Sequence, residues 1–177
     1  MPFWFQETKL IMSNIPQIII DERPISRNNS PYIIAEMSAN HNGSIENAKE
    51  IINSAKLSGA NAIKIQTYKP DTITLNHDSD EFKIKKGLWS GRTLYDLYEE
   101  AHMPWDWHRP LFDFAKEIGI SIFSSPFDKT AVDLLESLNA PAYKIASFEI
   151  VDTPFGSDLR YFMSKIFEGL LYSKNLL

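Results

Sequence analysis

Residues 32–43 read YIIAEMSANHNG, an apolar run that ends in a cluster of polar residues able to carry out chemistry. The same arrangement recurs in AIKIQT at 62–67, ISIFSS at 120–125 and AYKIAS at 142–147. In a (β/α) barrel the active site lies at the carboxyl ends of parallel strands, so polar groups repeated there indicate one site assembled from several strands. The chain is therefore expected to be an enzyme or part of one.

The apolar runs are separated by segments with helical spacing. The segment 45–57 follows a possible Ser44 cap, the segment 111–118 stops at Gly119, and Asp128 can cap a helix over 129–138. Strands that alternate with helices predict right-handed parallel crossovers, so the expected fold class is α/β, a parallel (β/α) TIM-barrel type. A small hairpin is expected within residues 17–25. The polar insertion at 68–92 is typical of a lid or binding loop.

Composition restricts the classes of function. A chain of 177 residues with 44% hydrophobic residues can bury one core, and its net charge of −5 is spread without long runs. That charge argues against general binding to nucleic acid or to an anionic membrane, and no apolar run is long enough for a membrane span. The absence of Cys fits a reducing compartment, so a cytoplasmic location is expected.

Two lysines, Lys64 and Lys144, lie inside apolar strands in closely similar settings, and both are expected to point inward. They fall on the second and fourth predicted strands, and alternate strands supply the same layer of a barrel interior, so the two ammonium groups should converge. At about 6 Å and an effective dielectric of about 20 they repel by roughly 3 kcal/mol, which requires either a neutral lysine or a bound anion. A substrate with a phosphate or carboxylate group meets that requirement.

Two other interpretations of these lysines stay open. In the first, one lysine extends to the rim while the other pairs with Glu36 or Glu149, as buried charges usually do. In the second, one lysine is a Schiff-base nucleophile of an unrelated aldolase.

Other polar residues fall at the same predicted edge. Glu36 is either a general acid or base or the partner of Lys64 in a salt bridge. In the loop 40–43, His41 is a metal ligand, a proton shuttle or a plain hydrogen-bonding residue. Three serines either bind phosphate oxygens near helix starts or only cap helices, and these are Ser124, Ser125 and Ser147.

Several motifs in fixed order resemble one known family. They are IIAEMSANHNGS at 33–44, AIKIQTYKPDTITL at 62–75, GLW at 87–89 followed by LYDLYEEA at 94–101, FSSPFD at 123–128 and AYKIASFE at 142–149. Together they resemble the amino-terminal half of the bacterial sialic acid synthase family, and its pseudaminic branch more than its N-acetylneuraminate branch. The resemblance extends from about Pro31 to Pro154.

The resemblance implies condensation of phosphoenolpyruvate with a 2,4-diacetamido-2,4,6-trideoxy-hexose, which gives a nine-carbon nonulosonic acid, pseudaminic acid, and phosphate. It implies that phosphoenolpyruvate is held by Lys64, Lys144, Ser125 and Ser147, that Glu36 and Glu149 are the acid–base candidates, and that Gln66 and Asn40 face the sugar. Tyr68 and the loop around Trp89 are further sugar-contact candidates, by position alone. The full-length family also implies a divalent metal, Mn²⁺ or Mg²⁺, and a homodimer.

The sequence departs from the family pattern after Pro154. Three parts are therefore expected: an extension with the possible hairpin at 1–30, a partial TIM-barrel synthase domain of about four βα units at 31–154, and a non-family helical tail at 155–177. The family's two metal-binding histidines on later strands are absent from this chain. Two alternatives remain: an N-acetylneuraminate synthase, which joins phosphoenolpyruvate to N-acetylmannosamine, or a non-catalytic remnant that self-associates through its open sheet edges.

Overall fold

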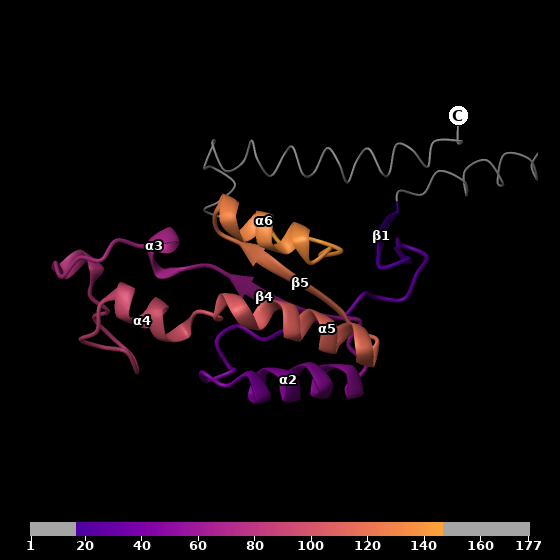
Figure 1. Ribbon diagram of the computed structural model, residues 1–177, viewed down its shortest axis with the longest axis horizontal. Coiled ribbons are helices and arrows are strands. Elements are labelled where there is room, and N and C mark those ends of the chain that lie inside the picture. The colour runs from indigo at the N-terminus through magenta and orange to yellow at the C-terminus, as the bar shows by residue number, and fades with distance from the viewer. Residues whose placement is uncertain (1–16, 147–177) are drawn as a thin grey trace, which may run out of the picture.

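A three-stranded parallel sheet forms the centre of the computed structural model, which describes residues 17–146. The strand order is β3-β4-β5, with strands β3 (Ile34–Glu36), β4 (Ala62–Thr67) and β5 (Ser121–Pro126). The helices that connect or follow these strands are α2 (Ile45–Leu57), α5 (His108–Ile118) and α6 (Lys129–Ser137) (Figure 1). The described part is therefore α/β with a parallel sheet, as the alternation of patterns predicted.

The predicted caps and the stop at Gly119 are confirmed, although α5 begins at His108, three residues before the predicted start. The Ser44 side chain accepts a hydrogen bond from the Asn47 N–H at the start of α2, and Asp128 accepts from the first backbone N–H groups of α6. Helix α5 ends at Gly119, whose φ of 71° is a left-handed conformation that a residue without Cβ adopts at low cost.

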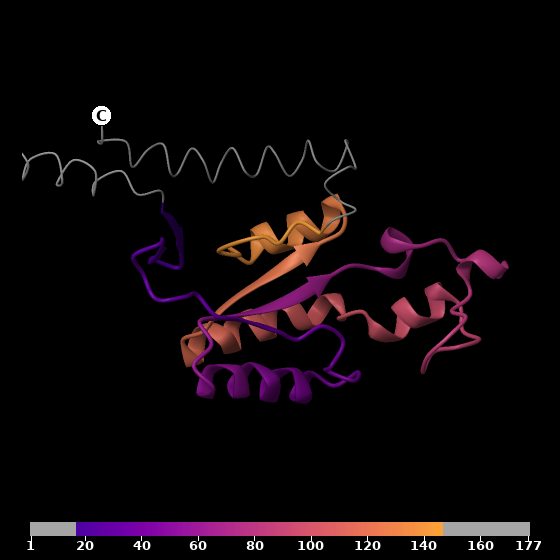
Figure 2. The same cartoon turned by 180° about the vertical axis from the view of Figure 1, so that it is seen from behind.

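The helices bury one face of the sheet. Helices α2 and α5 lie side by side, and α6 lies along β5 (Figures 1 and 2). Ile63, Ile65 and Ile122 project from the strands into the same cluster as Ile52 of α2 and Leu111 of α5. Because side chains alternate along a strand, the residues between these isoleucines project from the opposite face.

The predicted hairpin before the first parallel strand is also present. Strands β1 (Ile18–Ile20) and β2 (Arg23–Ile25) pair in antiparallel register, with positive φ at Asp21 and Glu22 in the turn. The Arg23 guanidinium lies over the Tyr32 ring, 5.3 Å from its centroid. This contact joins the hairpin to the segment that leads into β3.

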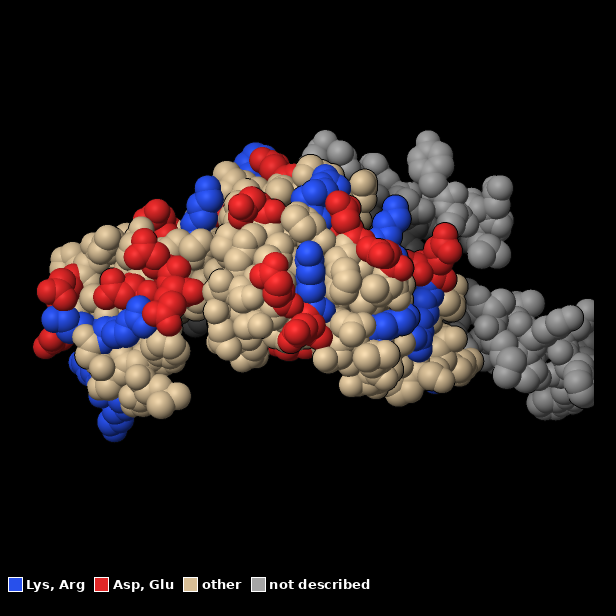
Figure 3. Space-filling model, turned by 60° about the horizontal axis from the view of Figure 1, so that its bottom comes forward, with Lys and Arg blue, Asp and Glu red and all other residues tan. Residues whose placement is uncertain are grey.

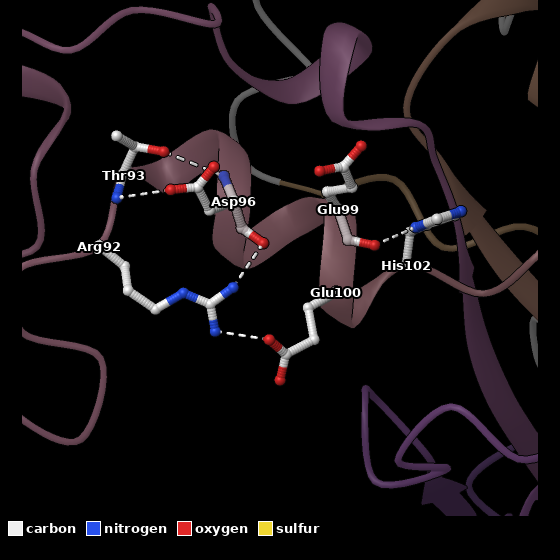
Figure 4. Close-up of polar contacts among 6 residues, drawn as sticks. All are labelled: Arg92, Thr93, Asp96, Glu99, Glu100 and His102. Atoms are coloured by element: carbon white, nitrogen blue, oxygen red, sulfur yellow. Dashed lines mark hydrogen bonds and ion pairs between the residues drawn. The ribbon is translucent and has the colours of Figure 1, made fainter.

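The insertion between β4 and α5 contains short helices, namely α3 (Pro70–Ile73), η1 (Asp80–Phe82), α4 (Leu94–Ala101) and η2 (Trp105–Trp107). Figure 4 shows what holds α4: the Thr93 hydroxyl accepts from the Asp96 N–H, and Arg92 binds both the Asp96 carbonyl and the Glu100 carboxylate. Acidic side chains gather on this end of the molecule, at the left of Figure 3. The carboxyl ends of β4 and β5 point toward it.

The fourth apolar run differs from its expected strand. In the part that the structure describes, it makes a single parallel bridge between Tyr143 and Ser124, together with a 3.0 Å hydrogen bond from the Lys144 N–H to the Ser124 carbonyl. The predicted tail at 155–177 lies outside the described residues. None of the described helices has the length and apolar character needed to cross a membrane.

Candidate active site

The carboxyl end of β3 carries an ion pair with β4. Glu36 and Lys64 are in register, and the Lys64 Nζ lies 2.5 Å from the Glu36 Oε2. The Lys64 side chain is 13% exposed, whereas that of Glu36 is 44% exposed. The salt bridge that sequence reasoning left open is therefore present in the structure. A pair with one half-exposed partner contributes only about 0–1 kcal/mol, so Glu36 can release the lysine at little cost.

Sheet register places four candidate residues on one face. Lys64 and Gln66 alternate with the core isoleucines, and Gln66 is in register with Ser125. Tyr143 is bridged to Ser124, so the next residue, Lys144, projects with Ser125 by the same alternation. The face opposite the helices thus carries two ammonium groups, an amide and a hydroxyl. Lys144 is exposed, and neither lysine lines a cavity described below.

The Ser125 hydroxyl is the unusual polar group on this face. Ser125 is 1% exposed, and its Oγ is buried without a hydrogen-bond partner among residues 17–146. A buried hydroxyl without a hydrogen-bond partner destabilises the folded state by about 1–3 kcal/mol, so most buried hydroxyls in proteins are hydrogen-bonded. A donor kept in this state is ready to bind an anion.

The neighbouring serine has a different environment, which sequence reasoning did not anticipate. Ser124 Oγ lies 2.6 Å from Thr67 Oγ1, which lies 2.9 Å from His108 Nε2. His108 Nδ1 lies 3.2 Å from the carbonyls of Pro104 and Trp105, and carbonyls only accept, so Nδ1 carries the ring proton. Nε2 then accepts from Thr67, and Thr67 accepts from Ser124.

This buried chain of hydrogen bonds ties the carboxyl ends of β4 and β5 to the start of α5. Burial lowers the pKa of His108, which keeps the neutral tautomer that the chain of hydrogen bonds requires. No sequence signal identifies the partners of His108, because Thr67 and Ser124 come from separate strands.

His41 has a structural role in the loop after β3. It is 1% exposed, its Nδ1 accepts from the Gly43 N–H at 3.2 Å, and its ring meets Trp107 edge-on at 5.5 Å. Burial, the largest influence, lowers the pKa of His41, so the ring is neutral at neutral pH. Of the three roles considered from sequence, hydrogen bonding is the one that these contacts support.

The sugar-contact candidates other than Gln66 make contacts of their own within the fold. Asn40 donates to the Met37 carbonyl and lines a cavity of about 660 Å³ beside α2. Tyr68 is buried against the rings of Tyr98 and Phe127, and burial raises its pKa to about 12. Trp89 is 41% exposed and lies under the Arg92 guanidinium. That these side chains contact the sugar stays a prediction.

Two predicted site residues, Ser147 and Glu149, lie outside the described residues. The implied divalent metal can be tested only against residues 17–146, where no group of three or more His, Asp or Glu side chains is placed to hold an ion. The described residues therefore do not fit that metal.

The fold and this face define an α/β protein with cationic and hydroxyl donors at the carboxyl ends of parallel strands. The NeuB family model matches residues 51–167, and the chain belongs to the NeuB family. It is 55% identical over 124 residues to a pseudaminic acid synthase of Campylobacter jejuni, which covers 70% of this chain and 36% of that protein. It is 52% identical over 122 residues to that of Helicobacter pylori, over 69% of this chain and 36% of that protein.

Among solved structures, the chain resembles an N-acetylneuraminic acid synthetase from Leptospira borgpetersenii, crystallised with citrate. The TM-score is 0.64 at 27% identity, over 78% of this chain and 44% of that one. The chain spans about a third of the length of the curated relatives that it matches.

Proposed function

We propose that the chain contributes the phosphoenolpyruvate-binding part of a pseudaminic acid synthase, built on the first βα units of a (β/α) barrel. Sequence identity to curated pseudaminic acid synthases supports the reaction. The observation that carries the binding proposal is the buried Ser125 hydroxyl, which has no partner in the described part of the chain and lies on the same sheet face as Lys64 and Lys144. A trianionic enol phosphate supplies the acceptors that these donors need.

The reaction joins the enol carbon of phosphoenolpyruvate to the aldehyde carbon of an open-chain 2,4-diacetamido-2,4,6-trideoxy-hexose. Water adds to the cation that results, and the enol C–O bond breaks to release phosphate. In this proposal Lys64 leaves Glu36 for the incoming phosphate or carboxylate, which frees the Glu36 carboxylate to exchange a proton. Gln66, in register with Ser125, faces the sugar.

Binding is the readout that tests this proposal on the 177-residue chain. In a calorimetric titration with phosphoenolpyruvate, the heat signal of the wild-type chain is expected to saturate. Lys64→Met is expected to weaken binding about ten- to hundredfold, because a charge-assisted hydrogen bond contributes about 1.5–3 kcal/mol. The Met stem keeps the apolar contacts of the strand. Lys85→Met, on an exposed residue of the insertion, removes one charge elsewhere and should change affinity less than about twofold.

Equal affinity in the wild-type chain and Lys64→Met would refute the proposed site. Phosphate release with the amino sugar and manganese then separates a synthase from a non-catalytic remnant, and little or no turnover is expected from this chain alone. Replacing the sugar with N-acetylmannosamine tests the N-acetylneuraminate alternative. Borohydride trapping of a lysine adduct would instead support the aldolase.

A further inference from the structure

A second cavity lies at the opposite, amino-terminal ends of the strands. It has a volume of about 660 Å³ and includes Asn61 and Ser121, which start or precede β4 and β5. The hairpin, the end of α2 and one side of α5 complete its wall. Ser121, in the wall of this cavity, lies four residues before Ser125 on β5, so the two serines are roughly 13 Å apart along the strand.

The cavity wall is cationic in a chain with a net charge of −5. Its charged lining consists of four basic and two acidic residues, namely Arg23, Lys56, Arg109, Lys116, Asp21 and Asp113. The basic residues come from three elements far apart in sequence, so the fold, and not a local charge run, brings them together. Lys and Arg side chains lie among acidic ones toward the hairpin end in Figure 3.

Backbone carbonyls hold two of these cations at the wall. Lys56 Nζ donates to the Gly119 carbonyl at the end of α5, and Arg109 Nη2 donates to the Ser137 carbonyl of α6 at 2.9 Å. Each of these bonds uses one donor, whereas an ammonium has three and a guanidinium five. Both cations are positioned by carbonyls at helix ends, which offset only part of their charge, and among residues 17–146 neither forms a salt bridge with a carboxylate.

A hydroxyl adds to the set of donors. Tyr32 lines the cavity beneath the Arg23 guanidinium, and its Oη is buried without a hydrogen-bond partner in the described part of the chain. Fixed cations together with an unused phenolic donor form a wall that suits an anion with several oxygens. A single chloride or a neutral ligand would leave most of these donors without acceptors.

We propose that this amino-end cavity binds a small polyanion of the phosphate class, at a site separate from that of phosphoenolpyruvate. The ligand carries at least two negative charges, since the wall has a net charge of two positive units. The proposal does not depend on the proposed synthase activity, because it uses only the cavity, its cations and the Tyr32 hydroxyl.

The test uses inorganic pyrophosphate as the probe and the 177-residue chain labelled with ¹⁵N. Saturable amide shifts are expected at Asn61, Gly119 and Ser121. The double variant Arg23→Gln/Lys116→Gln is expected to raise the Kd at these amides at least about tenfold. The control Lys85→Gln/Lys86→Gln removes the same charge from the exposed insertion and should raise it less than about twofold.

Three results would overturn the proposal. They are the absence of saturable shifts up to about 10 mM pyrophosphate, equal weakening in both double variants, and shifts confined to Gln66 and Ser125. Lys64→Met should leave the amino-end shifts unchanged even where it abolishes phosphoenolpyruvate binding. Failure of one site is thereby distinguished from failure of the other.

Discussion

The free energy of unfolding should change in opposite directions when either of two adjacent serines on β5 is replaced by alanine. Ser124 and Ser125 are 0% and 1% exposed, so both hydroxyls are removed from water to the same extent. Ser124 binds Thr67 at 2.6 Å, whereas Ser125 Oγ has no partner among the described residues. Ser124→Ala should destabilise the fold by about 1 kcal/mol, and Ser125→Ala should stabilise it by about 1–3 kcal/mol by removing an unsatisfied group.

Urea unfolding of the two variants and of the wild type, with equal m-values, measures the difference in unfolding free energy. The variants should differ by about 2–4 kcal/mol, which in a chain of this size separates their Tm values by at least about 4 °C. Ser125→Ala should also weaken phosphoenolpyruvate binding, while Ser124→Ala retains most of it. If Ser125→Ala proved as destabilising as Ser124→Ala, its hydroxyl would have a partner and the reasoning would fail.

Burial lowers the pKa of His41 and His108 below the usual 6.5, so near and below that pH the unfolded chain binds protons that the folded chain excludes. Stability toward urea should therefore be greatest above about pH 6.5 and fall as the pH drops below it, by up to about 1.4 kcal/mol per pH unit for each histidine. His108→Gln should reduce that slope, and an unchanged slope would contradict the assignment. Glu36→Gln should tighten phosphoenolpyruvate binding about three- to tenfold, because it removes the carboxylate that competes for Lys64; calorimetry showing weaker binding would give Glu36 a direct part in the complex. Gly119→Ala should lower the free energy of unfolding by about 1 kcal/mol, because φ is 71° there; an unchanged urea midpoint would argue against that conformation.

Local sequence was sufficient to predict the helices and the parallel direction of the strands. The Ser44 and Asp128 caps and the Gly119 stop act within one or two turns, so a reader of the sequence can locate them. The extent of the fourth strand was not predictable in the same way. The run at 142–147 has strand composition, yet Tyr143 is the only residue of its described part that forms a bridge, because pairing depends on a neighbour and not on composition.

The prediction for Lys64 and Lys144 shows a different limit of what the sequence can predict. Sequence reasoning placed Lys64 and Lys144 on one face, and the register agrees with that placement. It did not decide between an anion and Glu36 as the partner of Lys64, because an ion pair with a half-exposed partner contributes only about 0–1 kcal/mol. In the proposed site, both pairings of Lys64 occur, and the concentration of the anion decides which one is populated.

The two serines of β5 show why the sequence predicted the position of the candidate site but not the role of each residue in it. Side chains alternate between the faces of a strand, so identical neighbours enter different chemical environments. Ser124 joins Thr67 and His108 on the helix-covered side, where every hydroxyl of the chain of hydrogen bonds is satisfied. Ser125 projects with Lys64 and Gln66 from the other side, where its hydroxyl has no hydrogen-bond partner among residues 17–146. In the proposed site, strand β5 therefore anchors the sheet with Ser124 and offers Ser125 to an anion, and only the register distinguishes the two serines.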